Sequence, residues 1–280
     1  MHDRTLLTDL SDRVLTVRLN RPEQLNAFTP AMGHDLMAVL NDADRDDGVR
    51  VVIVTGQGRA FCAGMDLSAG GSTFDGSAER TLDTHRDEGG QLALRIFEMR
   101  KPVIAAINGP AVGVGVTMTL PMDIRIAAES ARLGFVFTRR GIVTEAASSW
   151  FLPRIVGMEQ ALEWVLSGRV FGAAEALRGR LVSRVVPDHE LLTTATSLAG
   201  EIAAHTSAVS IGLCRQMLWR MQGAAGPREA HLLDSKAMFH MGRSADAAEG
   251  VTSFLEKRPA CFPMRLSTDW PDFLPWPEKS

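Results

Sequence analysis

Two short segments of this chain could do chemistry with their main chain alone. Residues 61–67 read Phe-Cys-Ala-Gly-Met-Asp-Leu, and residues 108–115 read Asn-Gly-Pro-Ala-Val-Gly-Val-Gly. Small residues let a ligand approach the backbone closely, and the second segment runs into a predicted helix start, where N–H groups are free and carry partial positive charge. Together the two segments could supply two N–H donors to one oxygen anion. Each of them, taken alone, is more simply a tight turn.

These glycines do not match the common nucleotide-binding motifs. The run Gly113-Val114-Gly115 lacks the third glycine of a dinucleotide-binding fingerprint, and the chain contains no phosphate-loop sequence that ends in Gly-Lys-Ser or Gly-Lys-Thr. Nucleotide binding of these two types is therefore disfavoured.

Glu145 is the best candidate for an acid or a base. Thr144 is a plausible N-cap, so that Glu145 would open a helix whose dipole favours the carboxylate. Burial near Phe135, Phe137 or Trp150 would instead raise the pKa of Glu145. The sequence leaves this balance open, and an ordinary carboxylate in the first turn of a helix is the simpler alternative.

Apolar patterns place both glycine segments after predicted strands. Residues 51–54 and 103–107 are continuously apolar and rich in β-branched residues or alanine, which indicates strands buried on both faces. Alternation at 15–19 indicates a half-buried strand, and 124–126 is a shorter candidate. Residues 29–44 have the spacing of an amphipathic helix. Strands that alternate with helices predict an α/β fold with largely parallel strands.

The C-terminal part of the chain has a different pattern. After about residue 190 the strand signals end, and helical patterns continue through residue 257. We therefore expect an α/β core over residues 1–195 and a helical region over residues 196–280.

Residues 69–90 are small and polar and then charged, which predicts a mobile surface loop. His85 or Asp87 could reach the site from this loop. They are more simply explained as solvated residues that cap the following helix, around residues 92–97.

Composition and charge exclude several classes of function. The 280 residues carry a net charge of −3 and show no basic stripe, which argues against a nucleic-acid partner. No run of about 18 apolar residues is present, so we expect no membrane span. The three widely spaced cysteines form neither a disulfide framework nor a zinc pattern, which favours a reducing compartment, and we expect the cytoplasm. No cluster has the spacing of metal ligands, so no metal site is expected.

The order of these motifs resembles the crotonase superfamily, the enoyl-CoA hydratase/isomerase family. The resemblance covers roughly residues 10–262. It rests on Leu25-Asn26-Ala27, on the segments 61–67 and 108–115, on Asp123 and on the C-terminal segment 249–259. It implies a spiral of ββα units with a helical C-terminal trimerisation region. It also implies that the N–H groups of Met65 and Val114 form an oxyanion hole for a thioester enolate. Many relatives have glycine where this chain has Val114, which would narrow the pocket.

The chain departs from the hydratases of this family in its carboxylates. The two positions where those enzymes carry glutamate align with Thr117 and Phe137. The segment around Glu145 resembles the one that carries the catalytic acid in certain enoyl-CoA isomerases, where one carboxylate moves a proton from C2 to C4. We therefore expect isomerisation of a Δ3-enoyl-CoA to a Δ2-enoyl-CoA through Glu145. The alternatives are hydration of an unusual enoyl-CoA and, from another class, a catalytically silent acyl-CoA-binding protein.

The resemblance also predicts how CoA and the subunits are arranged. It places the CoA moiety near residues from the first two motifs and near two residues of a neighbouring subunit. These residues are Asn26, Ala27, Ala63, Asp66 and Leu67, with Phe254 and Lys257 from the neighbour. Helix packing for Phe254 and a solvated face for Lys257 are the alternatives. We expect a homotrimer or a homohexamer that needs no cofactor beyond the CoA of its substrate.

Overall fold

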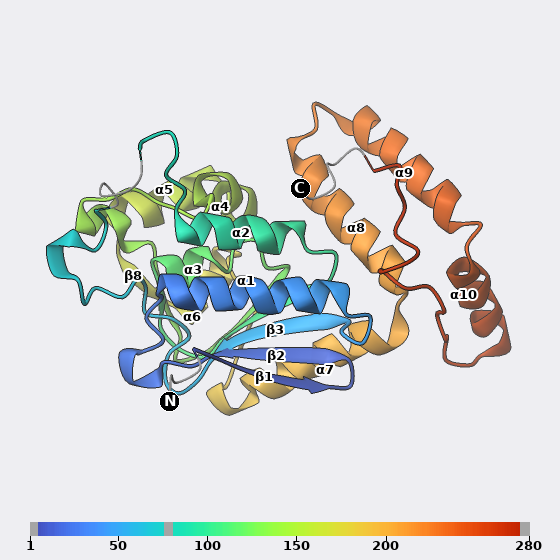
Figure 1. Cartoon of the computed structure of the whole chain (residues 1–280), viewed down its shortest axis with the longest axis horizontal. Helices are drawn as coiled ribbons and strands as arrows, with labels where there is room; N and C mark the ends of the chain where they lie inside the picture. The colour runs from blue at the N-terminus through green and yellow to red at the C-terminus, as the bar shows by residue number, and fades with distance from the viewer. Residues whose placement is uncertain (1–4, 76–80, 275–280) are drawn as a thin grey trace.

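The fold is a layered α/β core with helices that extend from one side. A computed structural model describes residues 5–75 and 81–274 of the chain. In Figure 1, helices α1 (Pro30–Arg45) and α2 (Glu88–Glu98) lie together over the sheet, and the last helices of the chain reach away from it. Of the predicted loop 69–90, residues 76–80 lie outside the described residues. The remainder forms turns up to residue 87, where α2 follows.

Two sheets make up the core. The larger has six strands in the order β1-β2-β3-β4-β6-β9, in which only the β1–β2 pair is antiparallel. Its strands are β1 (Leu6–Ser11), β2 (Val14–Leu19), β3 (Val51–Gly56), β4 (Val103–Ile107), β6 (Ile124–Ala128) and β9 (Arg184–Val186). The smaller sheet has the order β5-β7-β8, with strands β5 (Ala111–Val112), β7 (Arg132–Gly134) and β8 (Val170–Gly172). The prediction of an α/β fold with largely parallel strands is confirmed.

Strand β3 is buried on both faces, as its apolar run predicted. Val52 and Val54 face the main core cluster, which also holds apolar residues of α1 and α2. Val51 and Ile53 face a second cluster beneath helix α7 (Leu191–His205). Every residue of β4 is likewise buried. A parallel strand with helices packed on both faces of its sheet has both faces buried, which explains these continuous apolar runs.

Helix α1 begins where the sequence predicts. Thr29 accepts a hydrogen bond from the N–H of Met32, and Pro30 occupies the first helical position, where its missing N–H costs nothing. The remaining core helices are α3 (Val114–Thr117), α4 (Ser148–Val156), α5 (Met158–Ser167) and α6 (Ala173–Arg178).

The predicted helix start at Thr144 and Glu145 is wrong. Helix α4 begins three residues later than Glu145, and two alanines with left-handed backbone, Ala146 (φ 56°) and Ala147 (φ 50°), separate it from Glu145. Glu145 therefore lies in an irregular segment outside the first turn of α4. The dipole of that helix does not act on it as the sequence interpretation assumed.

Helices dominate the chain after residue 190, as predicted. Helix α7 packs on the large sheet, and α8 (Ala208–Arg220), α9 (Pro227–Met241) and α10 (Ala245–Glu256) follow it. The tail after α10 runs back beside α8, where Leu266 joins Val209 and Leu213 in a small apolar cluster. The expected boundary at residue 195 falls within α7, and the division into two units remains a prediction. Within residues 5–75 and 81–274, no helix has the length and apolarity needed to cross a membrane.

Candidate functional site

The two glycine segments lie side by side, each beyond the carboxyl end of a buried strand. Cys62 and Ala111 form an isolated parallel bridge, in which the Val112 N–H donates to the Cys62 carbonyl at 3.0 Å. Gly64 (φ 108°) comes so close that a Cβ on it would lie 3.1 Å from the Val112 carbonyl oxygen. Gly113 also has a left-handed backbone (φ 57°). Both positions need glycine because an L side chain would be strained there.

Met65 in the first segment and Val114 in the second each have an N–H group that is not used within the described residues. The flanking Asp66 N–H donates to the Phe28 carbonyl at 2.8 Å, and the Gly113 N–H donates to the Gly134 carbonyl at 2.9 Å. Within the described residues, the N–H groups of Met65 and Val114 donate no hydrogen bond. Both residues line the same cavity. The arrangement can therefore offer two main-chain donors to an oxygen in the cavity.

The cavity has a volume of about 740 Å³, and its lining combines apolar side chains with polar and charged ones. Its walls come from both glycine segments, from residues 66–75, from the first turn of α2 and from residues 136–145. Phe137, which aligns with a missing glutamate, is one of the wall residues. A volume of several hundred Å³ is typical of a site for an organic ligand.

Glu145 is half-buried in the cavity wall, and its carboxylate has one described hydrogen-bond donor. The Thr117 hydroxyl donates to Glu145 Oε1. Thr117 is fully buried, at the end of the four-residue helix that Val114 begins. The sequence aligned Thr117 with a missing glutamate, and its contact with Glu145, 28 residues away, was not predicted.

The pKa of Glu145 is raised to about 7, chiefly because burial disfavours the charged carboxylate. The hydrogen bond from Thr117 opposes this rise, and the carboxyl of Asp87 adds to it. At neutral pH both protonation states of Glu145 are therefore well populated, as general acid–base catalysis requires.

The N-terminus of α2 contacts the backbone directly after Glu145. Asp87 caps α2 by accepting from the Gly90 N–H at 2.5 Å, and the same oxygen accepts from the Ala146 N–H at 3.1 Å. The prediction that Asp87 caps this helix is therefore confirmed, but Asp87 is partly buried and no capping contact is described for His85. Both His85 and Asp87 also line the cavity.

Gly89 is a site residue that the sequence interpretation missed. A Cβ on it would overlap Glu145 Oε2 and would lie 3.1 Å from a methyl carbon of Val114. The only signal in the sequence was the pair Gly89-Gly90 at a helix start, where glycine is unfavourable for helix formation.

The residues predicted to contact CoA fall into three groups. Ala63, Asp66 and Leu67 line the cavity. Asn26 and Ala27 do not. The buried Asn26 amide donates to the carbonyls of Gln57 (2.9 Å) and Ala60 (2.7 Å), so it fixes the loops behind the cavity.

The third group lies at the helical end of the molecule. Phe254 is in α10 and is 81% exposed, and Lys257 ends that helix with a left-handed backbone. Neither residue belongs to the cavity of its own chain. Their predicted contact with a neighbouring subunit remains a prediction.

Comparisons with known proteins agree on one family. The sequence profile described as enoyl-CoA hydratase/isomerase matches residues 9–265. "Enoyl-CoA hydratase ACTT3" of Alternaria alternata is 46% identical over 249 residues, which cover 89% of this chain and 82% of that protein. "1,2-Epoxyphenylacetyl-CoA isomerase" of Escherichia coli (strain K12) is 35% identical over 90% of this chain and 96% of its own length.

Solved structures give the same result for the fold. The crystal structure of a probable enoyl-CoA hydratase/isomerase from Mycobacterium abscessus matches with a TM-score of 0.85 at 34% identity, covering 92% of this chain and 98% of that one. The expected crotonase-type α/β fold with C-terminal helices is confirmed.

Proposed function

Because the chain belongs to the enoyl-CoA hydratase/isomerase family, we propose that this acyl-CoA enzyme moves the double bond of an enoyl-CoA from C3 to C2, with Glu145 as its proton carrier. The observation that carries the proposal is the Glu145 carboxyl in the cavity wall, whose pKa burial raises. It lies beside two unused main-chain N–H groups and has a pKa of about 7.

The proposed reaction has two proton transfers on one carboxyl group. The Glu145 carboxylate takes a proton from C2 of the Δ3-enoyl thioester, and the charge moves onto the thioester oxygen. The N–H groups of Met65 and Val114 stabilise that oxygen. Loss of one such donor typically costs about 3–4 kcal/mol of transition-state stabilisation. The protonated Glu145 then returns the proton to C4, which leaves the conjugated Δ2-enoyl thioester. No atom is added, so one carboxyl group suffices.

The second candidate is hydration of an unusual enoyl-CoA, and the names of several relatives favour it. "Enoyl-CoA hydratase ACTT3" and "Enoyl-CoA hydratase AFT3-1" of Alternaria alternata are 46% and 45% identical to this chain. Hydration needs a group that activates water, and Asp87 or His85 in the cavity wall would have to assist Glu145. The isomerase named among the relatives, at 35% identity, supports the first candidate.

The binding of CoA and the assembly of subunits extend this proposal. Ala63, Asp66 and Leu67 in the cavity wall would contact CoA directly, and Asn26 and Ala27 would support that wall from behind. No cofactor beyond the CoA of the substrate is proposed. The free cysteines agree with a cytoplasmic location.

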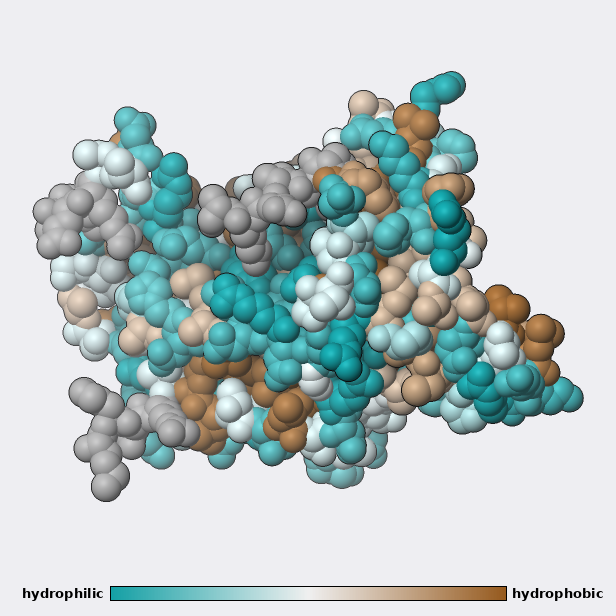
Figure 2. Space-filling model, turned by 45° about the vertical axis from the view of Figure 1, so that its right-hand side comes forward, coloured by the Kyte–Doolittle hydropathy of each residue, from teal (hydrophilic) through white to brown (hydrophobic). Residues whose placement is uncertain are grey.

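We also propose a homotrimer or a homohexamer. Large apolar side chains of α10 are exposed at the helical end, including Val251 (62%), Phe254 (81%) and Leu255 (73%). Figure 2 shows apolar surface at this end of the molecule. Exposed apolar patches of this kind mark protein interfaces. A particle mass of three or six chains by light scattering would support the assembly, and a monomeric mass would contradict it.

The test of the function is a pair of substrates with matched variants. Purified protein is incubated with a trans-3-enoyl-CoA and, separately, with a trans-2-enoyl-CoA, while conjugated thioester absorbance and product masses are followed. We expect the 3-enoyl substrate to gain conjugation without a change in mass. Glu145→Gln should lower kcat by about 10²–10⁴-fold, the usual contribution of a general acid–base group. The control Glu201→Gln, at an exposed position on α7, should leave kcat unchanged.

Either of two results would contradict the proposal. A mass gain of one water from the 2-enoyl substrate, without isomerisation, would establish hydration instead. Binding of both substrates without turnover, unaffected by Glu145→Gln, would leave only acyl-CoA binding.

A further inference from the structure

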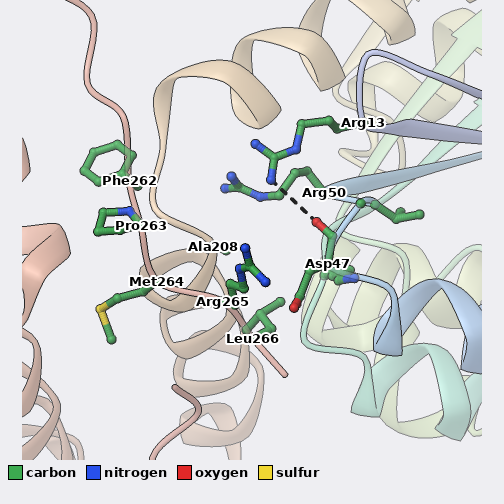
Figure 3. A pocket seen from close by; sticks show the side chains of 12 residues that line it. Arg13, Asp47, Arg50, Ala208, Phe262, Pro263, Met264, Arg265 and Leu266 are labelled. Carbon is green, nitrogen blue, oxygen red and sulfur yellow. Dashed lines mark hydrogen bonds between the residues drawn. The ribbon is translucent and has the colours of Figure 1, made fainter. Parts of the chain in front are cut away.

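A second cavity lies at the opposite end of the large sheet from the site described above. The glycine segments follow the carboxyl ends of β3 and β4, whereas this cavity lies beside Arg50, the residue that precedes β3. Its volume is about 450 Å³. Figure 3 shows it between the α/β core on one side and residues 262–266 of the C-terminal tail on the other.

Four cationic side chains stand among the lining residues, beside apolar residues of the core and the tail. Arg13 and Arg50 come from the core, Arg265 comes from the tail, and Lys101 lies beneath them. Asp47 is the one carboxylate among the lining residues, and the N–H and hydroxyl of Ser267 already donate to it. Within the described part of the chain, none of the three arginines forms an ion pair with a carboxylate.

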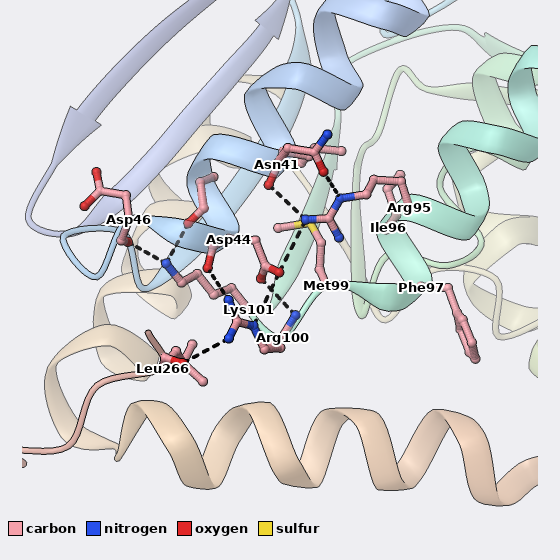
Figure 4. A network of polar contacts seen from close by, with 12 residues as sticks. Asn41, Asp44, Asp46, Arg95, Ile96, Phe97, Met99, Arg100, Lys101 and Leu266 are labelled. Atoms are coloured by element: carbon pink, nitrogen blue, oxygen red, sulfur yellow. Dashed lines mark hydrogen bonds and ion pairs between the residues drawn. The ribbon is translucent and has the colours of Figure 1, made fainter. Parts of the chain in front are cut away.

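Arg50 differs in this respect from Arg95 and Arg215, whereas the buried Arg125 also forms no ion pair within the described residues and donates to four carbonyls. Arg95 and Arg215 are about equally buried, and each is paired with an aspartate, as Figure 4 shows for Arg95 and its neighbours. Arg50 is 7% exposed, and its guanidinium donates at 2.7 Å to the Thr206 carbonyl, a neutral partner. Arg125 is satisfied by four carbonyls, whereas the described donations of the Arg50 guanidinium all go to Thr206, which leaves N–H groups of Arg50 available to an anion.

The neighbouring charges support this conclusion. Burial lowers the pKa of Arg50, and the positive charge of Arg13 lowers it further, while Asp246 acts in the opposite direction. Asp246 forms no ion pair with Arg50; its Oδ1 accepts from the Met264 N–H at 2.9 Å. The Lys101 ammonium is engaged by the carbonyls of Ala43 and Asp46. Lys101 and the three arginines therefore all carry positive charge without an ion pair within the described residues, and the arginines keep N–H groups that can face the cavity.

We propose that this cavity is a binding site for a phosphate group, held by Arg50 at its floor and by Arg13 and Arg265 at its rim. Guanidinium groups match phosphate oxygens in charge and in hydrogen-bond geometry. The cavity is larger than one phosphate ion, so it has room for the organic part of a small phosphate ester. Since Arg265 belongs to the tail and the other two arginines to the core, the bound anion fastens the tail onto the core.

The test measures phosphate binding by the full chain with isothermal titration calorimetry at constant ionic strength. The probes are inorganic phosphate and, in a separate arm, glycerol 3-phosphate. We expect saturable binding with one site per chain. Tighter binding of the ester would identify a phosphorylated metabolite as the occupant, and equal binding would identify the free ion.

Matched variants assign the binding to this cavity. Arg50→Met and, independently, the rim double variant Arg13→Gln with Arg265→Gln should each weaken phosphate binding by about tenfold or more, because each removes charge-assisted hydrogen bonds. The rim variant removes exposed side chains, so it tests the proposal even if Arg50→Met fails to fold. The control, Arg178→Gln with Arg184→Gln, removes two exposed arginines outside the cavity and should bind as the parent does.

The KM for the acyl-CoA substrate should stay unchanged in the rim variant. Absence of saturable binding in the parent protein, or equal binding by the parent and the rim variant, would overturn the proposal.

Discussion

Asp123 and Glu145 are two partly buried carboxyl groups with opposite surroundings. Asp123 receives hydrogen bonds at 2.8 Å from the Val103 N–H, the Trp219 indole and the Arg215 guanidinium. Glu145 receives one described hydrogen bond, from Thr117, and has the Asp87 carboxyl beside it in place of a cation.

The difference teaches how one chemical group takes on two roles. Asp123 accepts hydrogen bonds from three donors, and it fastens α8 to the start of β4 and β6. Glu145 lacks a counter-charge, so its charged form is disfavoured and its pKa moves to about 7. A carboxyl group in a cleft whose pKa is raised in this way is a candidate for acid–base catalysis, whereas a fully paired carboxyl group is a candidate for a structural role.

The largest effect is expected from Arg215→Met, which tests the structural role of Asp123. It removes the charge that faces Asp123, together with hydrogen bonds to the carbonyls of Ile96 and Phe97. We expect the free energy of unfolding to fall by about 3–5 kcal/mol, because the aspartate is left uncompensated. Urea denaturation measures this change, and Arg184→Met, at an exposed position, is the control. If Arg215→Met lost no more unfolding free energy than the control variant, the ion pair would not be what holds Asp123.

The proposed catalytic role of Glu145 is tested by Gly89→Ala. The added methyl group would overlap Glu145 Oε2, so the carboxylate must move. A displacement of about 1 Å in an active site can cost about 10²-fold in rate, and we expect kcat to fall by that order while the fold is kept. Gly200→Ala is the matched control, since a Cβ there meets no atom within 4 Å. Full activity of the Gly89→Ala enzyme would show that the rate does not depend on this position of the Glu145 carboxylate.

A third test uses the dependence of stability on pH. The pKa of Glu145 is raised from 4.5 to about 7, so the folded state holds a proton that the unfolded chain has already released. The resulting loss of stability is absent below pH 4.5, grows as the pH rises, and is complete above pH 7. Glu145→Gln removes this pH-dependent loss of stability. Relative to the parent, the variant should therefore gain on the order of 2 kcal/mol between pH 5 and pH 8. Unfolding curves at both pH values measure this gain, and a constant difference would contradict the raised pKa.

The smallest expected effect comes from Thr117→Val. The Thr117 hydroxyl stabilises the charged carboxylate, so its removal should raise the pKa of Glu145 further. With Glu145 as the base, kcat/KM rises as that group ionises, and the rise should move to higher pH by about one unit. The pH profile of kcat/KM measures the shift. A shift toward lower pH would mean that the hydroxyl favours the protonated form.

The sequence predicts most of what is local in this fold. The apolar runs at 51–54 and 103–107 place β3 and β4, and the spacing from Met32 to Leu40 places α1. The strands of the small sheet are only two or three residues long, and so short a pattern carries no reliable periodicity.

The site was predictable only where it depends on adjacent residues. The segments that carry Met65 and Val114 are readable as glycine turns, whereas the surroundings of Glu145 depend on contacts between distant residues. The Ala146 N–H is held by Asp87, 59 residues away, and this contact outweighs the local signal for a helix that begins at Thr144. The approach of Gly89 to the Glu145 carboxylate is a contact of the same kind.

The left-handed backbone of Ala146 and Ala147 has an evolutionary consequence. A non-glycine residue in this conformation costs about 1–2 kcal/mol, and the chain has two in succession directly after Glu145. Glycine at either position would relieve the strain, yet it would also loosen the backbone that aims the carboxylate. At these two positions, selection for a stable fold and selection for a rigid site therefore act in opposite directions. Lineages that drift toward higher stability are expected to lose catalytic precision here first.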